Sequence, residues 1–289
     1  TDAAYVMFTS GSTGTPKAIL ASHAGLRHFI DWEIAELGIG AGIRVANLAL
    51  PTFDVSLRDI FLPLAAGGTA CIAPRAVRRD GAALVAWLSS EKIAVAHVVP
   101  SIFRLALKAI EEAPTALPDL RHLLFGGEML WGADVERARA TLGGAVTLRN
   151  LYGPSETTLA KCCYRIDGPV APARAIPVGA PLPGTQVLIV KDDRLAAPGA
   201  IGELYIAPPF APFGYLGDAQ KTAEHFITRA EWGDRVFYRT GDLGRSLANG
   251  AIEVCGRLDG QVKVNGVRIE LGEIEQAAMA SDEVDAAVA

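Results

Sequence analysis

The chain has 289 residues, of which 50% are hydrophobic, enough to bury the core of one large domain or two smaller ones. Its 27 basic and 32 acidic residues give a net charge of −5, and without a basic run this excludes an extended nucleic-acid-binding face. Apolar runs are too short for a membrane span and no signal-peptide pattern occurs, so we expect a cytoplasmic protein that does not enter a membrane. The 4 cysteines lack metal-ligand spacing, so we expect reduced thiols and no zinc site.

The first half of the chain alternates short β-rich runs with helical patterns. Buried strands are expected at 5–9, 44–50, 68–74, 93–99, 120–126 and 145–153. Residues 22–37 have helical hydrophobic spacing behind a cap at Ser22, and 80–92 and 100–113 read as further helices, the latter with Pro100 in its first turn. This order predicts an α/β fold with a largely parallel, helix-covered sheet.

Two changes of composition follow. Residues 171–186 are rich in proline and glycine, and 187–207 read as two strands around a turn, which predicts a small β-rich subdomain. From Gly256 onward, two alternating strands meet at Asn265 and Gly266, a strong hairpin signal because this turn needs positive φ at both central residues. A helix is expected to begin within 271–280.

Residues 9–17, TSGSTGTPK, have the composition of a phosphate-binding loop. Small residues let successive backbone N–H groups approach phosphate oxygens, and Lys17 adds positive charge. The spacing from Gly14 to Lys17 excludes the nucleotide-binding P-loop of Walker type. Taken alone, the stretch also fits a flexible surface loop.

Further motifs share the order and spacing of one family. They are FDVS (53–56), NLYGPSE (150–156), GELYI (202–206), YRTGDL (238–243) and GRLDGQVKVNGVRIELGEIE (256–275). With TSGSTGTPK, they make the whole chain resemble the amino-acid adenylation domains of nonribosomal peptide synthetases, within the adenylate-forming superfamily that includes acyl-CoA synthetases and luciferases.

The resemblance implies a ligase that uses ATP and Mg²⁺ to convert an amino acid into aminoacyl-AMP with release of pyrophosphate. The aminoacyl group would then pass to the phosphopantetheine thiol of a peptidyl carrier protein, as in antibiotic biosynthesis. Neighbouring synthetase domains and a small MbtH-type helper protein are the other implied partners. Two alternatives stay open: an acyl- or aryl-CoA ligase of the same superfamily, and a non-catalytic nucleotide-binding domain.

The same resemblance divides the chain into three parts. Residues 1–168 and 169–258 would be the α/β and β-rich parts of the large N-terminal subdomain, and 259–289 the start of a C-terminal lid. The family's earliest segments and the lid's catalytic lysine have no counterpart here, so we expect the chain alone to be a poor enzyme. Pro208 and Pro209 stand where the family has glycines, so we expect a rebuilt loop away from the reaction centre.

The resemblance assigns the nucleotide to residues spread along the chain. The phosphates of ATP fall to Thr9, Ser10, Gly11, Ser12, Thr13, Gly14 and Lys17. The adenine falls to Tyr152, with Asn150, Gly153 and the backbone at Gly127 and Glu128 nearby. Asp242 would accept hydrogen bonds from the ribose hydroxyls, and Glu156 would bind Mg²⁺. Without the other motifs, Tyr152 would read as a core aromatic residue and Asp242 as a turn residue.

The catalytic set that the resemblance implies consists of Lys17, Glu156, Arg257 and Asp259. Arg257 resembles the arginine beside the ribose and phosphates, and Asp259 the hinge about which the lid rotates. Lys263 would lie on the face that the lid exposes after rotation, although a charged strand residue otherwise simply faces solvent.

Asp54 resembles the aspartate that pairs with the substrate's α-ammonium group, whereas its alternative role is to cap a helix beginning at Val55. The substrate's side chain would be lined by Val55, Arg58, His97, Leu124, Gly126, Leu151, Leu159 and Ala160. Arg58 and His97 would meet a hydroxyl, a phenol or an acidic group, unless His97 is a satisfied core histidine. The pattern is similar to pockets for hydroxyphenylglycine, but Arg58 replaces an aromatic residue there, so the substrate stays open.

Overall fold

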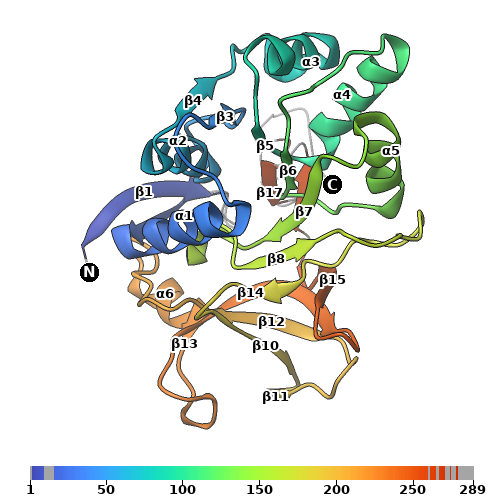
Figure 1. The fold of residues 1–289 in the computed structure, drawn as a ribbon. Coiled ribbons are helices and arrows are strands. Elements are labelled where there is room, and N and C mark those ends of the chain that lie inside the picture. Colours follow the sequence, from blue (N-terminus) through green and yellow to red (C-terminus); the bar gives the residue numbers. More distant parts are fainter. Residues whose placement is uncertain are drawn as a thin grey trace.

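A computed structural model describes residues 2–9, 16–259, 261–264, 267–270, 274 and 278. Its larger sheet has seven strands, in the order β4 (Thr69–Ile72), β3 (Arg44–Asn47), β5 (Val95–Val98), β6 (His122–Phe125), β7 (Thr147–Tyr152), β8 (Cys162–Arg165) and β9 (Ala180–Pro181). The strands from β4 to β7 are parallel, while β8 and β9 extend the sheet in antiparallel fashion (Figure 1). The predicted parallel sheet is therefore confirmed, with an antiparallel edge.

Five helices accompany this sheet: α1 (His23–Leu37), α2 (Val55–Ala66), α3 (Gly81–Ser90), α4 (Pro100–Glu112) and α5 (Gly132–Leu142). The predicted cap of α1 is confirmed, because Ser22 Oγ accepts a hydrogen bond of 3.1 Å from the Gly25 amide. Pro100 occupies the first turn of α4, as expected. Among the described residues, no helix is both long and apolar enough to cross a bilayer.

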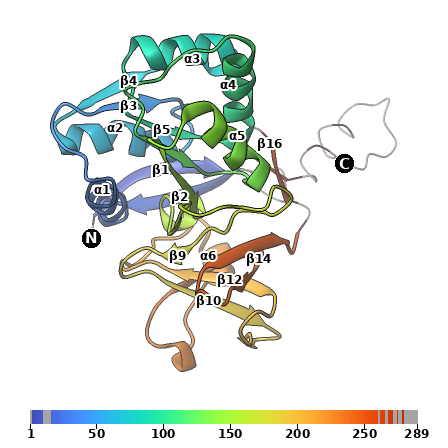
Figure 2. The same cartoon turned by 45° about the vertical axis from the view of Figure 1, so that its right-hand side comes forward.

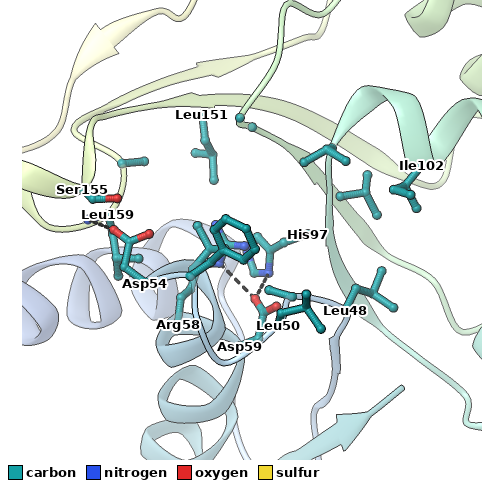
Figure 3. Close-up of a pocket in the computed structure, with 18 of the residues that line it drawn as sticks. Leu48, Leu50, Asp54, Arg58, Asp59, His97, Ile102, Leu151, Ser155 and Leu159 are labelled. Atoms are coloured by element: carbon teal, nitrogen blue, oxygen red, sulfur yellow. Dashed lines mark hydrogen bonds and ion pairs between the residues drawn. The ribbon is translucent and has the colours of Figure 1, made fainter. Parts of the chain in front are cut away.

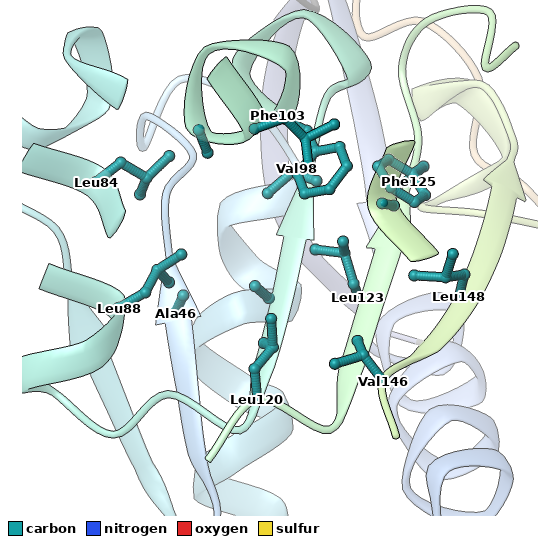
Figure 4. Close-up of a cluster of buried hydrophobic side chains, with 14 of the residues drawn as sticks. Ala46, Leu84, Leu88, Val98, Phe103, Leu120, Leu123, Phe125, Val146 and Leu148 are labelled. Atoms are coloured by element: carbon teal, nitrogen blue, oxygen red, sulfur yellow. The ribbon is translucent and has the colours of Figure 1, made fainter. Parts of the chain in front are cut away.

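Alternating strand residues build a core on each face of the sheet. Val45 and Leu124 pack into a cluster with residues of α1 and α2, whereas their neighbours Ala46 and Leu123 pack into a cluster with α3, α4 and α5 (Figure 4). Successive strand side chains point to opposite faces, so a sheet covered on both sides needs apolar residues at consecutive positions. This explains the near-continuous apolar runs of the sequence.

The strand order predicts a crevice at the carboxyl ends of two neighbouring strands inside the sheet. From β3 the chain passes through α2 to β4 on one side, and then through α3 to β5 on the other side of β3. In open α/β sheets, ligands bind outside the carboxyl ends of the strands where the order reverses in this way. The ends of β3 and β5 therefore mark where a ligand site belongs.

A second, antiparallel sheet follows, in the order β11 (Arg194–Leu195), β10 (Gln186–Lys191), β12 (Gly202–Ala207), β14 (Phe237–Ser246) and β13 (Phe226–Ile227), with β15 (Ile252–Arg257) also paired to β14. The two strands predicted within 187–207 are β10 and β12. This region also holds the short helix α6 (Ala219–His225). The described residues also form three 3₁₀ turns: Val77–Arg79, Ser155–Thr157 and Ala230–Trp232.

The two sheets meet through a small apolar cluster. Cys162 of β8 packs with Val178, Leu204 and Ile252, and Ile252 pairs with Gly179 across the junction. Figure 2 shows the second sheet beside β9. Strand β9 lies in the predicted range 169–258 yet extends the first sheet, so that range does not coincide with one sheet.

The prediction that residues 5–9 form a buried strand of the parallel sheet was wrong. Strand β1 (Ala3–Thr9) pairs antiparallel with β2 (Lys17–Ser22) in a separate sheet, and Phe8 is 66% exposed. Only residues 10–16 separate these strands, and a parallel crossover needs a dozen residues or more. Proximity in sequence therefore imposed a hairpin.

The predicted C-terminal hairpin is present as β16 (Gln261–Val264) and β17 (Val267–Glu270), which pair antiparallel with Lys263 opposite Arg268. Its predicted turn residues, Asn265 and Gly266, lie outside the described residues. So does the helix expected within 271–280, apart from two helical positions, 274 and 278.

Candidate active site

A cavity of about 1300 Å³ opens at the carboxyl ends of the parallel strands, where the strand order predicts it. It is bordered by the ends of β3, β5, β6 and β7, the start of α2, and strands β14 and β15. The structure brings every residue predicted for the substrate side chain to this cavity: Val55, Arg58, His97, Leu124, Gly126, Leu151, Leu159 and Ala160 (Figure 3). Asp54 lines it as well.

Asp54 faces the cavity rather than capping α2. Its backbone is already helical, and its side chain makes no capping hydrogen bond, so the alternative interpretation as a helix cap was wrong. Instead, Oδ2 accepts from the Leu159 amide at 3.4 Å, and the residue is 8% exposed. Burial raises the pKa of Asp54, an effect that Ser155, Leu159 and Arg58 only partly counter. A cation in the cavity would stabilise its charged form.

The Leu159 amide that reaches Asp54 belongs to a strained loop. Thr158 and Leu159 have φ of 64° and 59°, a region that costs side-chain-bearing residues about 1–3 kcal/mol each. The Lys161 ammonium group, fully buried, donates to the carbonyls of Thr158 at 2.5 Å and Ala160 at 3.1 Å. It also lies 5.5 Å from the Phe210 ring centroid. Lys161 therefore holds this loop in place.

Lys161 was missed by the sequence analysis, although a lysine within the apolar run LAKCC was a visible signal. Burial lowers its pKa from 10.5 to about 7, against the opposing effect of Asp54. Between pH 7 and 10.5 the unfolded chain binds one more proton than the folded protein. Lys161 therefore makes the free energy of unfolding rise with pH, by up to about 1.4 kcal/mol per pH unit. At pH 7 and below, the full cost of the buried charge is present.

We therefore expect Lys161→Met to remove this pH dependence. Urea unfolding between pH 7 and 9.5 should show that the free energy of unfolding of the wild type rises with pH relative to that of the variant. Lys108→Met, at a side chain that is 71% exposed in α4, is the control and should leave the slope unchanged. If the free energies of unfolding of wild type and Lys161→Met changed with pH in parallel, the lowered pKa of Lys161 would be contradicted.

A network of four ionisable groups lies beside α2, and three of them, Arg58, Asp59 and His97, line the cavity. His97 Nε2 lies 2.7 Å from Glu33 Oε1, and His97 Nδ1 lies 3.0 Å from Asp59 Oδ1. Arg58 Nε donates to the same Asp59 oxygen at 3.0 Å. His97 therefore both lines the cavity and has buried partners, so the two interpretations of this residue are compatible.

Tyr152, Asp242 and Arg257 form a second polar group on the cavity wall. The Tyr152 hydroxyl donates to Asp242 Oδ2 and Arg257 Nη1 donates to Asp242 Oδ1, each at 2.5 Å. Burial, followed by the Asp242 charge, raises the pKa of Tyr152, which keeps the phenol protonated as a donor. A carboxylate has about four lone-pair sites, so Asp242 retains acceptor capacity. Thr9, Gly127 and Gly153 line the cavity too.

Arg257 also binds Asp259, with Nε and Nη2 donating to its two oxygens at 2.6 and 2.7 Å. Asp259 is not among the residues that line the cavity. The predicted hinge residue is thus tied to a cavity residue, while its role as a hinge stays a prediction.

Lys17 and Glu156 are both buried, and neither is among the residues that line the cavity. Glu156 Oε1 accepts a hydrogen bond of 3.2 Å from the Tyr215 hydroxyl. Burial, then Lys17, lowers the pKa of His225, and Glu156 opposes this, so the three side chains are close enough to interact. The remaining predicted phosphate-loop residues, Ser10, Gly11, Ser12, Thr13 and Gly14, lie outside the described residues.

Two residues predicted near the adenine have side chains engaged elsewhere. The Asn150 amide donates to the carbonyls of Ile176 and Pro177 at 3.1 and 3.0 Å. The Glu128 carboxylate accepts from the amide and hydroxyl of Ser101 at 2.9 and 2.8 Å. Neither lines the cavity. Asn150 thus ties β7 to the junction of the sheets, and contact of either residue with a nucleotide stays a prediction.

Comparison with known proteins identifies the family of the chain. The profile of the family described as "AMP-binding enzyme" matches residues 1–216. The chain is 34% identical over its whole length to 4% of tyrocidine synthase 3 of Brevibacillus parabrevis. It is 36% identical, over 96% of its length, to 52% of an L-proline--[L-prolyl-carrier protein] ligase of Streptomyces coelicolor.

The fold likewise matches solved structures. The Vibrio cholerae adenylation domain AlmE, in complex with glycyl-adenosine-5'-phosphate, superposes with a TM-score of 0.87 at 30% identity, covering 98% of this chain and 53% of AlmE. Holo-PA1221, an NRPS protein with adenylation and PCP domains, gives 0.83 at 31% identity, covering 95% of this chain and 47% of PA1221. The chain spans about half or less of each of these four proteins. With its motifs, its fold and its cavity in agreement, the chain belongs to the AMP-binding enzyme family.

Proposed function

We propose that this chain activates an amino acid with ATP, forming aminoacyl-AMP and releasing pyrophosphate. The observation that carries the proposal is that one cavity holds both the Asp54 carboxylate and the Tyr152, Asp242 and Arg257 group. A buried carboxylate suits an α-ammonium group, and the second group supplies an acceptor and donors for a ribose and a phosphate. AlmE, bound to an aminoacyl adenylate, is a structural neighbour with the same fold.

In the proposed reaction, an oxygen of the substrate carboxylate attacks the α-phosphorus of ATP. An O–P bond forms, the bond to the β-phosphate oxygen breaks, and pyrophosphate leaves with that electron pair. Asp54 fixes the ammonium end, Asp242 the ribose, and Arg257 and Lys17 offset negative charge on the phosphates. Holding the two reactants together and stabilising developing charge can account for most of such an acceleration.

Magnesium suits the proposed phosphate side. Mg²⁺ at a nucleotide is usually held by one or two carboxylates together with phosphate oxygens. Glu156 offers one buried carboxylate, and the charges of Glu156 and Lys17 both act on His225. The described residues contain no cluster of three or more potential ligands that would indicate an all-protein site. When bound, the ion would neutralise phosphate charge.

We further propose that the aminoacyl group passes to the phosphopantetheine thiol of a carrier protein. The thiolate attacks the acyl carbon, a thioester forms and AMP leaves. Support comes from two relatives: one is named as a ligase for a prolyl-carrier protein, and the other joins adenylation and PCP domains in one protein. Neighbouring synthetase domains and an MbtH-type helper belong to the same proposal.

ATP–pyrophosphate exchange by the full-length protein tests the proposed activation. We expect exchange with at least one amino acid and none with its analogue lacking the α-amino group. Exchange with the desamino acid at an equal rate would instead indicate an acyl- or aryl-CoA ligase. No exchange with any acid, in a protein that still binds ATP, would indicate a non-catalytic nucleotide-binding domain.

A further inference from the structure

The cavity wall beside α2 carries unusually buried charge. Glu33 and Asp59 are 0% exposed, His97 is 4% exposed and Arg58 is 7% exposed. Figure 3 shows Asp59 between Arg58 and His97 on one side of the cavity, opposite the apolar Leu151. Removing charges from water is costly unless they are paired, so their arrangement constrains what else the wall can accept.

The four groups already balance one another. His97 lies between the carboxylates of Glu33 and Asp59, at 2.7 and 3.0 Å. Burial and Arg58 lower the pKa of His97, but the two carboxylates outweigh them and the net pKa is raised. When His97 is protonated, an imidazolium and a guanidinium face two carboxylates, and the four groups together carry no net charge. An acidic substrate side chain would add an uncompensated negative charge in a buried place.

The wall nevertheless has unused hydrogen-bonding capacity. Asp59 Oδ2 is buried and has no hydrogen-bond partner among the described residues. Arg58 uses Nε for Asp59, and within the described part of the chain no hydrogen bond involves its two Nη atoms. Both residues line the cavity. Here, donors and an acceptor stand side by side, and leaving such groups unpaired costs about 1–3 kcal/mol each.

Helix geometry gives the distance between Asp54, which would bind the substrate's ammonium group, and the Arg58 and Asp59 side chains. Asp54 and Arg58 are four residues apart at the start of α2, so their side chains lie about one turn, ~5–6 Å, from each other. An α-ammonium group at Asp54 would therefore place the end of a side chain of about three carbons beside Arg58 and Asp59. The remaining lining, from Val55, Leu124 and Leu151, suits its methylene stem.

Resting on the proposed function, we infer that the pocket selects an amino acid whose neutral side chain both accepts from Arg58 and donates to Asp59, as the carboxamide of glutamine does. The carbonyl oxygen would accept from the guanidinium, and the NH₂ group would donate to Asp59 Oδ2. This inference differs from pairing of Arg58 with a substrate anion, because Asp59 already supplies the counter-charge.

Exchange assays with isosteric amino acids test the inference. In the full-length protein we expect kcat/KM for glutamine to exceed that for glutamate and for methionine by at least about 100-fold, since sites built for hydrogen bonds reject analogues lacking them strongly. Asparagine, aspartate and leucine form a shorter set of the same kind. An acid or an apolar side chain at least as active as the amide would overturn the inference while leaving the proposed function intact. No exchange with any amino acid would defeat both.

The variant Asp59→Asn tests whether the charge of Asp59 causes the preference for glutamine over glutamate. Removing one negative charge without changing shape should raise the ratio of glutamate to glutamine activity at least about tenfold, equivalent to about 1.4 kcal/mol. Asp31→Asn, at a side chain 62% exposed in an ion pair of α1, is the matched control and should leave that ratio unchanged. An unchanged ratio in a folded Asp59→Asn protein would overturn the inference; if that variant does not fold, the wild-type panel still decides.

Discussion

Asp54→Asn is expected to lower kcat/KM for the amino acid by at least about 100-fold while changing KM for ATP little. Removing one partner of a buried charge pair typically costs about 3–5 kcal/mol, and each 1.4 kcal/mol is tenfold. The carboxylate lines the cavity and does not cap α2, so its loss should be felt by the ligand rather than by the helix. Exchange kinetics with each substrate varied in turn would measure both effects.

Stability measurements separate this role from a structural one. Burial raises the pKa of Asp54, so its charged form is disfavoured in the free protein, and asparagine should preserve or increase the free energy of unfolding. Asp80 provides the contrast, because its side chain does cap α3, accepting from the Ala83 amide at 2.8 Å. Asp80→Ala should cost about 1 kcal/mol of stability with activity retained. Equal loss of stability and activity in Asp54→Asn would argue against ammonium binding.

Asp242→Ala is expected to raise KM for ATP by about 10- to 100-fold, with a smaller effect on KM for the amino acid. The substitution removes the proposed ribose acceptor and leaves the Tyr152 hydroxyl and Arg257 without a shared partner. A lost hydrogen bond to a charged group costs about 1.5–3 kcal/mol, which sets this range.

Two further observations check the assignment of Asp242. The pKa of Tyr152 should fall in the variant, because the second-largest cause of its elevation is the Asp242 charge. Ultraviolet titration of tyrosine ionisation would detect this. Glu253→Gln, which breaks the Arg245 ion pair of 2.6 Å on the same pair of strands, is the control and should leave KM for ATP unchanged. If Asp242→Ala raised KM for the amino acid more than KM for ATP, the ribose would not bind at Asp242.

The sequence by itself determined several helices, much of the parallel sheet and most of the cavity residues. Apolar runs at consecutive positions, the cap at Ser22 and the proline at the start of α4 were enough to predict the helix-covered parallel sheet. Four family motifs led to cavity residues: FDVS at the start of α2, NLYGPSE at the end of β7, YRTGDL on β14 and the Arg257 motif at the end of β15. Local chemistry carries such information without knowledge of the fold.

Only the tertiary structure decided which side chains meet. No motif includes Glu33, Asp59 or Lys161. Glu33 and Asp59 nevertheless pair with His97 and Arg58. Lys161 holds the loop beside Asp54. Glu33 and His97 are 64 residues apart, and no sequence period records a pairing across that distance. The same is true of Tyr152 and Asp242, 90 residues apart on different sheets. A periodic pattern reports which face of an element is buried, whereas the charge and reach of a site depend on how separate elements pack.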